Sequence, residues 1–397
     1  MLRQPPAYSP ISLGALIRGA GSLSANSDRA VEMLTEELCV RFGAERALLT
    51  SGGTHALQTV LSILGRNPDE TVVALPGYSC FDLVTAAVGA RVKVRFYDVD
   101  PVTLCPDLDS VRRVLREGVS TLVAGNLYGF PLDFEAVRAE CRAAGVLIVE
   151  DAAQGIGSRS ESGDSGSLGD ATIISFGRGK GWTGGGGGAL LLRASATTLA
   201  DDSHSGHSVD GRGGRPALSS LVAWALGRPS LYWIPASIPG LGLGETRYHN
   251  PTEPRGITVF SAALAAQTAE AAQDAASGRR KVAARWSALL EGDTGQSAGM
   301  RPCEPTGGLD QASGLRCPVV ASSAARAAAL VHSTRVLGVE RGYPTPLHKL
   351  SQSPIATGHD TSKLRGSVEL AERLLTLPTH RWVGPRTFSA FDRAIRA

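Results

Sequence analysis

Two strand-like segments decide how this chain folds: GVLIVEDAAQ, residues 145–154, and ATIISFGRGK, residues 171–180. Each is an apolar run that ends in polar or charged residues, as expected of a buried strand whose last residues reach the edge of a sheet. In open sheets of parallel strands, ligands bind outside the carboxyl ends of the strands. The residues that follow these two segments are therefore the first place to look for chemistry.

Strands and helices alternate outward from these segments. The periodicity predicts strands at 47–51, 71–75, 91–99, 120–125, 145–151, 171–176 and 188–193. It predicts helices at 28–42, 107–117 and 133–144. It also predicts a helix that begins near Thr54 and a separate helical stretch that ends at about Val88. Strands separated by helices indicate an α/β fold with a mostly parallel central sheet and right-handed crossovers.

The second half of the chain has a different pattern. A Gly/Ser/His-rich stretch at 201–214 predicts a mobile loop, and an apolar, proline-containing segment follows at 216–244. Helical periodicity returns at about Thr258, and a strand at 316–321 and a helix at 322–337 indicate a smaller C-terminal α+β domain. We therefore divide the chain into an N-terminal arm at 1–27, a large domain at 28–250 and a small domain at 251–397.

Composition excludes several classes of protein. Of the 397 residues, 43% are hydrophobic and 19% charged, so a packed core is expected and general disorder is not. The net charge of +3, without a Lys/Arg stripe, argues against nucleic acid as a main partner. The six cysteines form no CxxC pair and no Cys/His cluster with metal spacing, so we expect no metal site. Free thiols and a start without an apolar leader predict a cytoplasmic protein.

The apolar segment 216–244 has three possible interpretations. A transmembrane helix is not expected, because Arg228, Pro229, Pro235 and Pro239 interrupt it. The segment could shape a substrate pocket, form a dimer interface or touch a membrane surface. A dimer interface is the simplest of these interpretations.

Asp151 ends the first of the two deciding strands, and Lys180 follows the second in the segment SFGRGK. A carboxylate at a buried strand end is costly unless it meets a cation, although Asp151 alone would more simply cap a following helix. A lysine in a cofactor pocket can form an imine and then shuttle protons, whereas most lysines are solvated charges. Ser175, at the end of the same strand, can donate a hydrogen bond to a phosphate.

Three glycine-rich segments are candidates for binding a phosphate or a nucleotide. GRGKGWT resembles a P-loop only superficially, because Gly181 stands where a P-loop has Ser or Thr. The run from Gly184 to Gly188 precedes a strand instead of a helix, so the dinucleotide fingerprint fails. SGGT, residues 51–54, lies at a strand-to-helix junction, where backbone N–H groups and the helix dipole favour a phosphate. An ordinary helix N-cap explains this junction equally well.

Taken together, these motifs resemble a known family. Along the chain come GGTHAL (52–57), Gly129 with Asp133, EDAAQ (150–154), Gly169-Asp170, the SFGRGK segment, YPTPLH (343–348) and LPTH (377–380). Their order and spacing resemble the DegT/DnrJ/EryC1/StrS family of PLP-dependent sugar aminotransferases, from about residue 28 to about residue 385. The resemblance implies pyridoxal 5'-phosphate (PLP) as cofactor. It also implies the PLP-dependent transferase fold of type I, in which a large domain with a mostly parallel sheet carries a smaller C-terminal α+β domain.

The resemblance also implies a role for each matching residue. Lys180 would hold PLP as a Schiff base and move the proton between the substrate and the cofactor. Asp151 would hold the pyridine nitrogen, and Gln154 would lie against the oxygen side of the ring. The phosphate would be bound by Gly53, Thr54 and Ser175.

At three places the chain departs from the family pattern. The position of the aromatic residue that stacks on the ring falls on Cys80, with Tyr78 and Phe81 nearby. Gly186 stands where the family has an acidic residue. For the family's loop that reaches the phosphate of the neighbouring subunit, the nearest match is the segment that contains Asn250.

The implied activity is a ping-pong transamination, in which glutamate donates an amino group that then passes to a nucleotide-linked keto sugar. Such sites lie at subunit interfaces, so a homodimer is expected. One rival is dehydration or amination of another carbonyl, although Lys180 argues against the family's dehydratases, which have a His there. A second rival is a non-catalytic regulator that binds PLP or a sugar, for which the missing acid at Gly186 leaves room. The failed glycine motifs disfavour a nucleotide hydrolase or a dehydrogenase.

Overall fold

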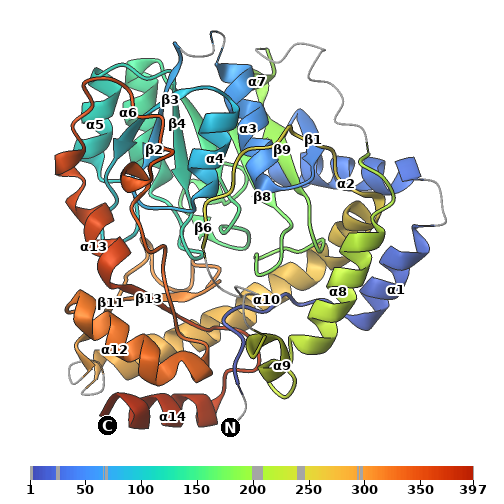
Figure 1. Ribbon diagram of the computed structural model, residues 1–397. Coiled ribbons are helices and arrows are strands. Elements are labelled where there is room, and N and C mark those ends of the chain that lie inside the picture. The colour runs from blue at the N-terminus through green and yellow to red at the C-terminus, as the bar shows by residue number, and fades with distance from the viewer. Residues whose placement is uncertain are drawn as a thin grey trace.

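The computed structural model of the chain describes residues 3–23, 27–65, 67, 70–198, 209–238, 246–292, 295 and 298–396. A large sheet with its helices occupies the upper part of Figure 1, and a long helix runs diagonally beneath it. A smaller sheet with three helices lies at the lower left of the same view. The expected α/β architecture with a smaller α+β part is confirmed.

The large sheet has seven strands in the order β1-β9-β8-β5-β4-β2-β3. Neighbours from β8 to β3 pair in parallel, whereas β9 pairs antiparallel with both β8 and β1. The strands are β1 (Arg46–Thr50), β2 (Val72–Pro76), β3 (Lys93–Tyr97), β4 (Thr121–Gly125), β5 (Leu147–Asp151), β8 (Ala171–Ser175) and β9 (Gly188–Leu192). Each begins and ends within two residues of the range that the periodicity predicts.

Helices cover both faces of this sheet because its strands are apolar on both sides. Buried side chains pack α3 (Gly53–Leu64) and α4 (Asp82–Gly89) on one face. On the other face lie α5 (Leu108–Arg116) and α6 (Phe134–Ala144), together with α2 (Ser27–Phe42) and α10 (Val259–Glu291). A two-stranded ribbon, β6 (Arg159–Ser160) with β7 (Gly163–Asp164), and the short α7 (Ala194–Thr197) complete this part of the fold.

The smaller sheet is antiparallel, in the order β10-β11-β13-β12. Its strands are β10 (Met300–Pro302), β11 (Cys317–Ala321), β12 (Glu340–Arg341) and β13 (Leu374–Leu377). Its helices are α12 (Ala324–Thr334), α13 (Arg365–Arg373) and α14 (Pro385–Arg396), with 3-10 turns at Arg335–Leu337, Leu347–Lys349 and Thr361–Lys363. Trp286 of α10 is fully buried against Phe388 and Phe391 of α14, so the long helix contributes to the small core as well as to the large one.

The apolar segment forms helices outside the sheet. Helix α8 (Gly214–Leu226) lies beside α1 (Leu13–Gly21) at the right of Figure 1, and the short α9 (Trp233–Ala236) lies near the lower end of α8. Several of their large apolar side chains are exposed: Leu13, Ile17, Leu218, Leu221, Val222 and Trp233. Of the predicted mobile loop, residues 201–208 lie outside the described residues, as do residues 239–244 of the apolar segment. Within the described ranges, no helix is long and apolar enough to cross a membrane.

Candidate active site

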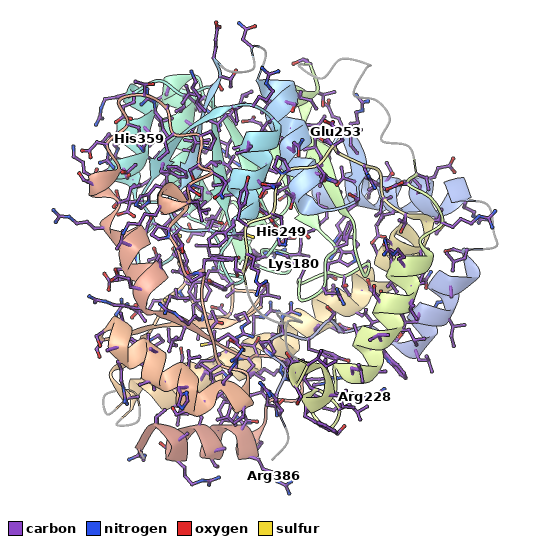
Figure 2. All side chains as sticks on the ribbon, viewed as in Figure 1. Lys180, Arg228, His249, Glu253, His359 and Arg386 are labelled. Atoms are coloured by element: carbon purple, nitrogen blue, oxygen red, sulfur yellow. The ribbon has the colours of Figure 1, made fainter. Side chains whose placement is uncertain are left out.

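A pocket opens at the carboxyl ends of β5 and β8, between the first turns of α3 and α4. Figure 2 labels Lys180 near the centre of the molecule, between the large sheet and the parts below it. Of the eight residues that the sequence predicted for the site, all but Asn250 line this pocket. The lining is Gly53, Thr54, Leu57, Cys80, Asp82, Leu83, Asp151, Ala153, Gln154, Ile173, Ser175 and Lys180.

Asp151 is the last residue of β5, where the register places it between Gly125 and Ile173. Its side chain is buried, and its Oδ1 accepts a hydrogen bond from the Ala153 backbone N–H at 3.0 Å. Burial raises the pKa of Asp151, and the charge of Lys180 acts in the opposite direction. The idea that Asp151 caps a following helix is wrong, because residues 153–157 form turns. A buried carboxylate with so few donors is a site for a cation.

Lys180 lies in the loop between β8 and β9, and its backbone N–H donates to the Gly177 carbonyl at 3.3 Å. Its Nζ makes no hydrogen bond and no ion pair with any of the described residues. A half-buried amine that lines a pocket and keeps its donors unused is available to react with a ligand.

The first turn of α3 offers a cradle for an anion. Gly52 precedes the helix and, as a glycine, offers no side-chain cap to the first backbone N–H groups. Ser175 faces this turn, and a Cβ added at Gly53 would lie 3.1 Å from the Cβ of Ser175. The Ser175 Oγ accepts from the Gly177 N–H at 3.3 Å, which leaves its own proton free to be donated. Thr54 adds a second hydroxyl to the lining.

Cys80 lines the pocket at the position where the family has a stacking aromatic, and neither Tyr78 nor Phe81 takes its place. Tyr78 is fully buried, and its hydroxyl lies 3.0 Å from the hydroxyl of Tyr128. Phe81 belongs to the core beneath α3 and α4. Burial raises the pKa of the Cys80 thiol to about 12, so the group is neutral and acts as a small apolar wall.

Gln154 connects the pocket to the C-terminal part of the chain. Its Oε1 accepts from the Tyr128 backbone N–H at 3.0 Å, and its Nε2 donates to the Tyr343 hydroxyl at 2.6 Å. Tyr343 also stacks on Tyr128, with ring centroids 5.9 Å apart, and its own N–H donates to the Tyr78 hydroxyl. These contacts fix the orientation of the Gln154 amide in the pocket wall.

Sequence reasoning missed two residues of the site. Asp82 lines the pocket in the first turn of α4, and its charge raises the pKa values of Cys80 and Asp151. Its position directly after Phe81, at a predicted strand-to-helix junction, was the available signal. The role of Tyr343 as the partner of Gln154 had no signal, because the two residues are 189 positions apart.

Asn250 is exposed and outside the pocket lining of this single chain. Its segment is held against α4, where the Thr85 hydroxyl donates to the His249 carbonyl at 2.8 Å. The histidines of the family-like text also lie outside the lining: His348 is near Phe96, and the Nε2 of His380 is 2.9 Å from the Pro5 carbonyl. Among the residues that the structure describes, no group of His, Cys, Asp or Glu could hold a metal ion.

Glu150, the neighbour of Asp151, has a structural role. It is completely buried, and its carboxylate accepts from the backbone N–H groups of Gly166 and Leu168 and from the hydroxyls of Ser165 and Thr172. These bonds anchor the turn between β7 and β8. Alternation along β5 therefore sends Glu150 into the scaffold and Asp151 into the pocket.

Comparisons with known proteins agree with this site. Residues 20–217, about half of the chain, match the model of the DegT/DnrJ/EryC1/StrS aminotransferase family. The chain is 31% identical to dTDP-4-dehydro-2,3,6-trideoxy-D-glucose 4-aminotransferase of Saccharopolyspora spinosa, over 33% of this chain and 34% of that protein. It is 29% identical to a pleiotropic regulatory protein of Geobacillus stearothermophilus, over 37% of this chain and 39% of that protein.

A solved structure extends the similarity of fold to nearly the whole chain. NtdA of Bacillus subtilis with bound cofactor PMP superposes with a TM-score of 0.72 at 16% identity, covering 98% of this chain and 83% of that one. The fold of this chain is therefore the fold of that solved structure. More particularly, the chain belongs to the DegT/DnrJ/EryC1/StrS aminotransferase family. The chain spans only about a third to two fifths of the length of these two curated relatives.

The family is PLP-dependent, and the residues of this pocket fit that cofactor. A PLP molecule brings a phosphate, a protonated ring nitrogen and an aldehyde carbon. The uncapped first turn of α3 with Ser175 suits the phosphate, the buried Asp151 suits the ring nitrogen, and the unpartnered Nζ of Lys180 suits the aldehyde. Three independent features of the pocket thus match the three functional groups.

Proposed function

We propose that this chain is a PLP-dependent aminotransferase that moves an amino group from glutamate to a nucleotide-linked keto sugar in a ping-pong reaction. The observation that carries the proposal is the pairing of an unpartnered Lys180 Nζ with a buried Asp151 in one pocket. The hypotheses of a dehydrogenase or a nucleotide hydrolase do not account for such a reactive amine. The S. spinosa relative, whose name states amination of a dTDP-linked keto sugar, supports the choice of acceptor.

Each side chain has a defined task in this proposal. Bound PLP supplies an electron sink for the bond that breaks at the substrate carbon. Lys180 holds PLP and then carries the proton at its Nζ as general base and general acid. Asp151 keeps the ring nitrogen protonated by pairing with it in a buried site. The α3 amides with Ser175 and Thr54 hold the phosphate, and Cys80 leaves space at the ring face where the family has an aromatic.

A homodimer is part of the same proposal, as are the division at residues 27 and 250 and a cytoplasmic location. The exposed apolar side chains of α1 and α8 support an interface: Leu13, Ile17, Leu218, Leu221 and Val222. In such a dimer Asn250, which is exposed in one chain, would serve the phosphate of the partner's site. Light scattering of the full chain and of Leu218→Asp tests this, with a monomer expected only for the variant.

The decisive test is the visible absorption of the purified full-length protein with PLP. Wild type should show the band of lysine-bound PLP, and glutamate should convert it to the band of the amine form. Lys180→Ala should show neither the first band nor the conversion. Lys93→Ala removes an exposed lysine of the edge strand β3 and is expected to match wild type.

The outcomes separate the alternatives. Wild type without a band after incubation with PLP would contradict the enzyme and favour the regulator, an idea that Gly186 and the name of the Geobacillus relative support. A band that glutamate leaves unchanged would keep PLP binding and remove glutamate as the donor. After conversion, a panel of keto-sugar nucleotides and non-sugar ketones identifies the acceptor by recovery of the first band.

A further inference from the structure

A second cavity lies apart from the Lys180 pocket and shares no residue with it. It is a groove of about 510 Å³ between the N-terminal arm, α8, α10 and the segment after β13. Its apolar walls include Ile11 of the arm, Trp224 of α8 and Ala275 of α10. A volume of this size is in the range of small-molecule sites.

The groove contains a buried cation without a counter-charge. Arg279 of α10 is 6% exposed, and its Nε donates to the Ser313 carbonyl at 3.1 Å. Its Nη2 is buried and has no hydrogen-bond partner among the described residues, and no ion pair of Arg279 occurs there either. Burial lowers the pKa of Arg279 to about 10, with Arg280 the one nearby charge that contributes, so the guanidinium stays positive at neutral pH. A buried charge in this condition calls for an anion.

The other ionisable groups of the groove leave this charge uncompensated. Arg381 donates to the Tyr8 hydroxyl at 3.0 Å and adds a second positive charge at the rim. His380 is neutral at neutral pH, because burial lowers its pKa to about 4. Asp274 is the one acidic residue of the lining; it is exposed on α10 and forms no ion pair with Arg279. The groove therefore presents two cations against one solvated carboxylate.

We propose that this groove binds a small amphipathic anion, with its carboxylate or phosphate head at Arg279 and its apolar body between Trp224 and Ile11. The inference goes beyond the proposed aminotransferase activity and rests on residues outside the Lys180 pocket. Figure 1 shows the arrangement that makes the groove, with α1 and α8 lying against the long helix α10. The apolar segment that the family pattern does not require thus supplies one wall of a binding site.

The groove also borders the loop that carries Lys180. The Gly179 N–H donates to the Ser9 hydroxyl of the arm at 2.8 Å. On the side of α10, a Cβ at Gly181 would lie 3.8 Å from the Nη2 of Arg279. An occupant would therefore rest on the arm that accepts a hydrogen bond from this loop and on a guanidinium that lies near the loop. For this reason the test uses protein whose Lys180 pocket is already filled with PLP.

The test is ligand-observed fluorine NMR with 4-fluorobenzoate on the full chain saturated with PLP. The neutral 4-fluorobenzyl alcohol has the same apolar body, and phenyl phosphate as competitor compares the two head groups. A hydrogen bond to a charged group corresponds to a preference of about tenfold or more for the anion over the alcohol. Competition by phenyl phosphate would show that the site binds both carboxylate and phosphate head groups. Failure of phenyl phosphate to compete would show that the site selects carboxylates.

A matched pair of variants at Gly278 locates the binding. Gly278 lines the groove, and a Cβ added there meets nothing within 4 Å, so the first atom of a new side chain has open space. Gly278→Phe should abolish binding, whereas Gly278→Ala should retain it; Arg279→Gln should weaken the acid and leave the alcohol unchanged. Equal binding of acid and alcohol, no binding of either, or full binding by Gly278→Phe would overturn the proposal. PLP spectra of all variants should stay native, so failure here leaves the aminotransferase proposal untouched.

Discussion

Replacing Asp151 with asparagine separates the charge of this side chain from its shape. The carboxylate is 9% exposed, and its one protein hydrogen bond among the described residues comes from the Ala153 N–H. Asparagine keeps the size and this acceptor but carries no charge. We expect two effects of opposite sign, one on the stability of the cofactor-free protein and one on the binding of PLP.

The stability of the cofactor-free protein should increase at neutral pH. Burial raises the pKa of Asp151 in the folded state. A carboxyl group with a raised folded pKa contributes stability below its unfolded pKa, and this contribution is lost as the pH rises through the folded pKa. The ionised carboxylate therefore opposes folding at neutral pH, and the advantage of Asp151→Asn should vanish in acid, where wild type is protonated.

The affinity for PLP should fall in the same variant. Removing one partner of a buried ion pair costs about 3–5 kcal/mol, which is about two to almost four powers of ten in affinity or rate. Denaturant unfolding across the pH range, titration with PLP and stopped-flow conversion by glutamate measure the two effects. The matched control Asp82→Asn changes the second carboxylate of the pocket. It should alter the affinity for PLP and the rate of conversion by glutamate by no more than about tenfold. If Asp151→Asn bound PLP and reacted with glutamate like wild type, Asp151 would not hold the ring nitrogen.

Three further changes test the surroundings of the site. Ser175→Ala removes one donor to the phosphate and should weaken PLP binding about ten- to hundredfold, as measured by titration; unchanged affinity would remove Ser175 from the phosphate site. Tyr343→Phe takes the acceptor from the Gln154 amide and should lower the free energy of unfolding by about 1–3 kcal/mol, read from urea curves, with an unchanged midpoint as the contrary result. Burial lowers the pKa of His380 from 6.5 to about 4. The contribution of this neutral histidine to stability is therefore complete above its unfolded pKa and falls by about 3 kcal/mol as the pH drops to about 4. His380→Gln should remove this acid slope, and an identical slope in the variant would assign it to other groups.

The sequence predicted the large sheet and most of the site because both are local in the chain. Each buried strand is a short apolar run, and the pocket residues follow β5 and β8 directly or begin α3. Gly129 in the family-like text also has a local physical reason: its φ is +87°, and a Cβ there would collide with Ser313 and Leu315. Periodicity and motif together were enough for this part.

The rest depends on contacts between distant segments. The Gln154–Tyr343 hydrogen bond joins residues 189 positions apart, and the groove around Arg279 joins residues near both ends of the chain. No short window of sequence contains either feature. Helix α1 lay inside a segment that was predicted only as an arm, since its apolar face becomes meaningful only against α8 and α10. Asp151 looked like a helix cap because the turns after β5 are fixed by the bonds of Glu150 and Gln154 to remote residues.

The charges of the pocket lead back to the dimer. Among its lining residues Lys180 is the one basic side chain, and it faces two carboxylates, Asp82 and Asp151. The ring nitrogen of PLP would balance one carboxylate, but its phosphate would meet only neutral donors from α3, Thr54 and Ser175. A doubly charged phosphate in a partly buried site is held best by a charged donor. The lining holds no such donor among the described residues. In the dimer proposed above, the Arg247–Asn250 segment of a partner subunit would supply one, and Arg247 and Asn250 are exposed in the single chain.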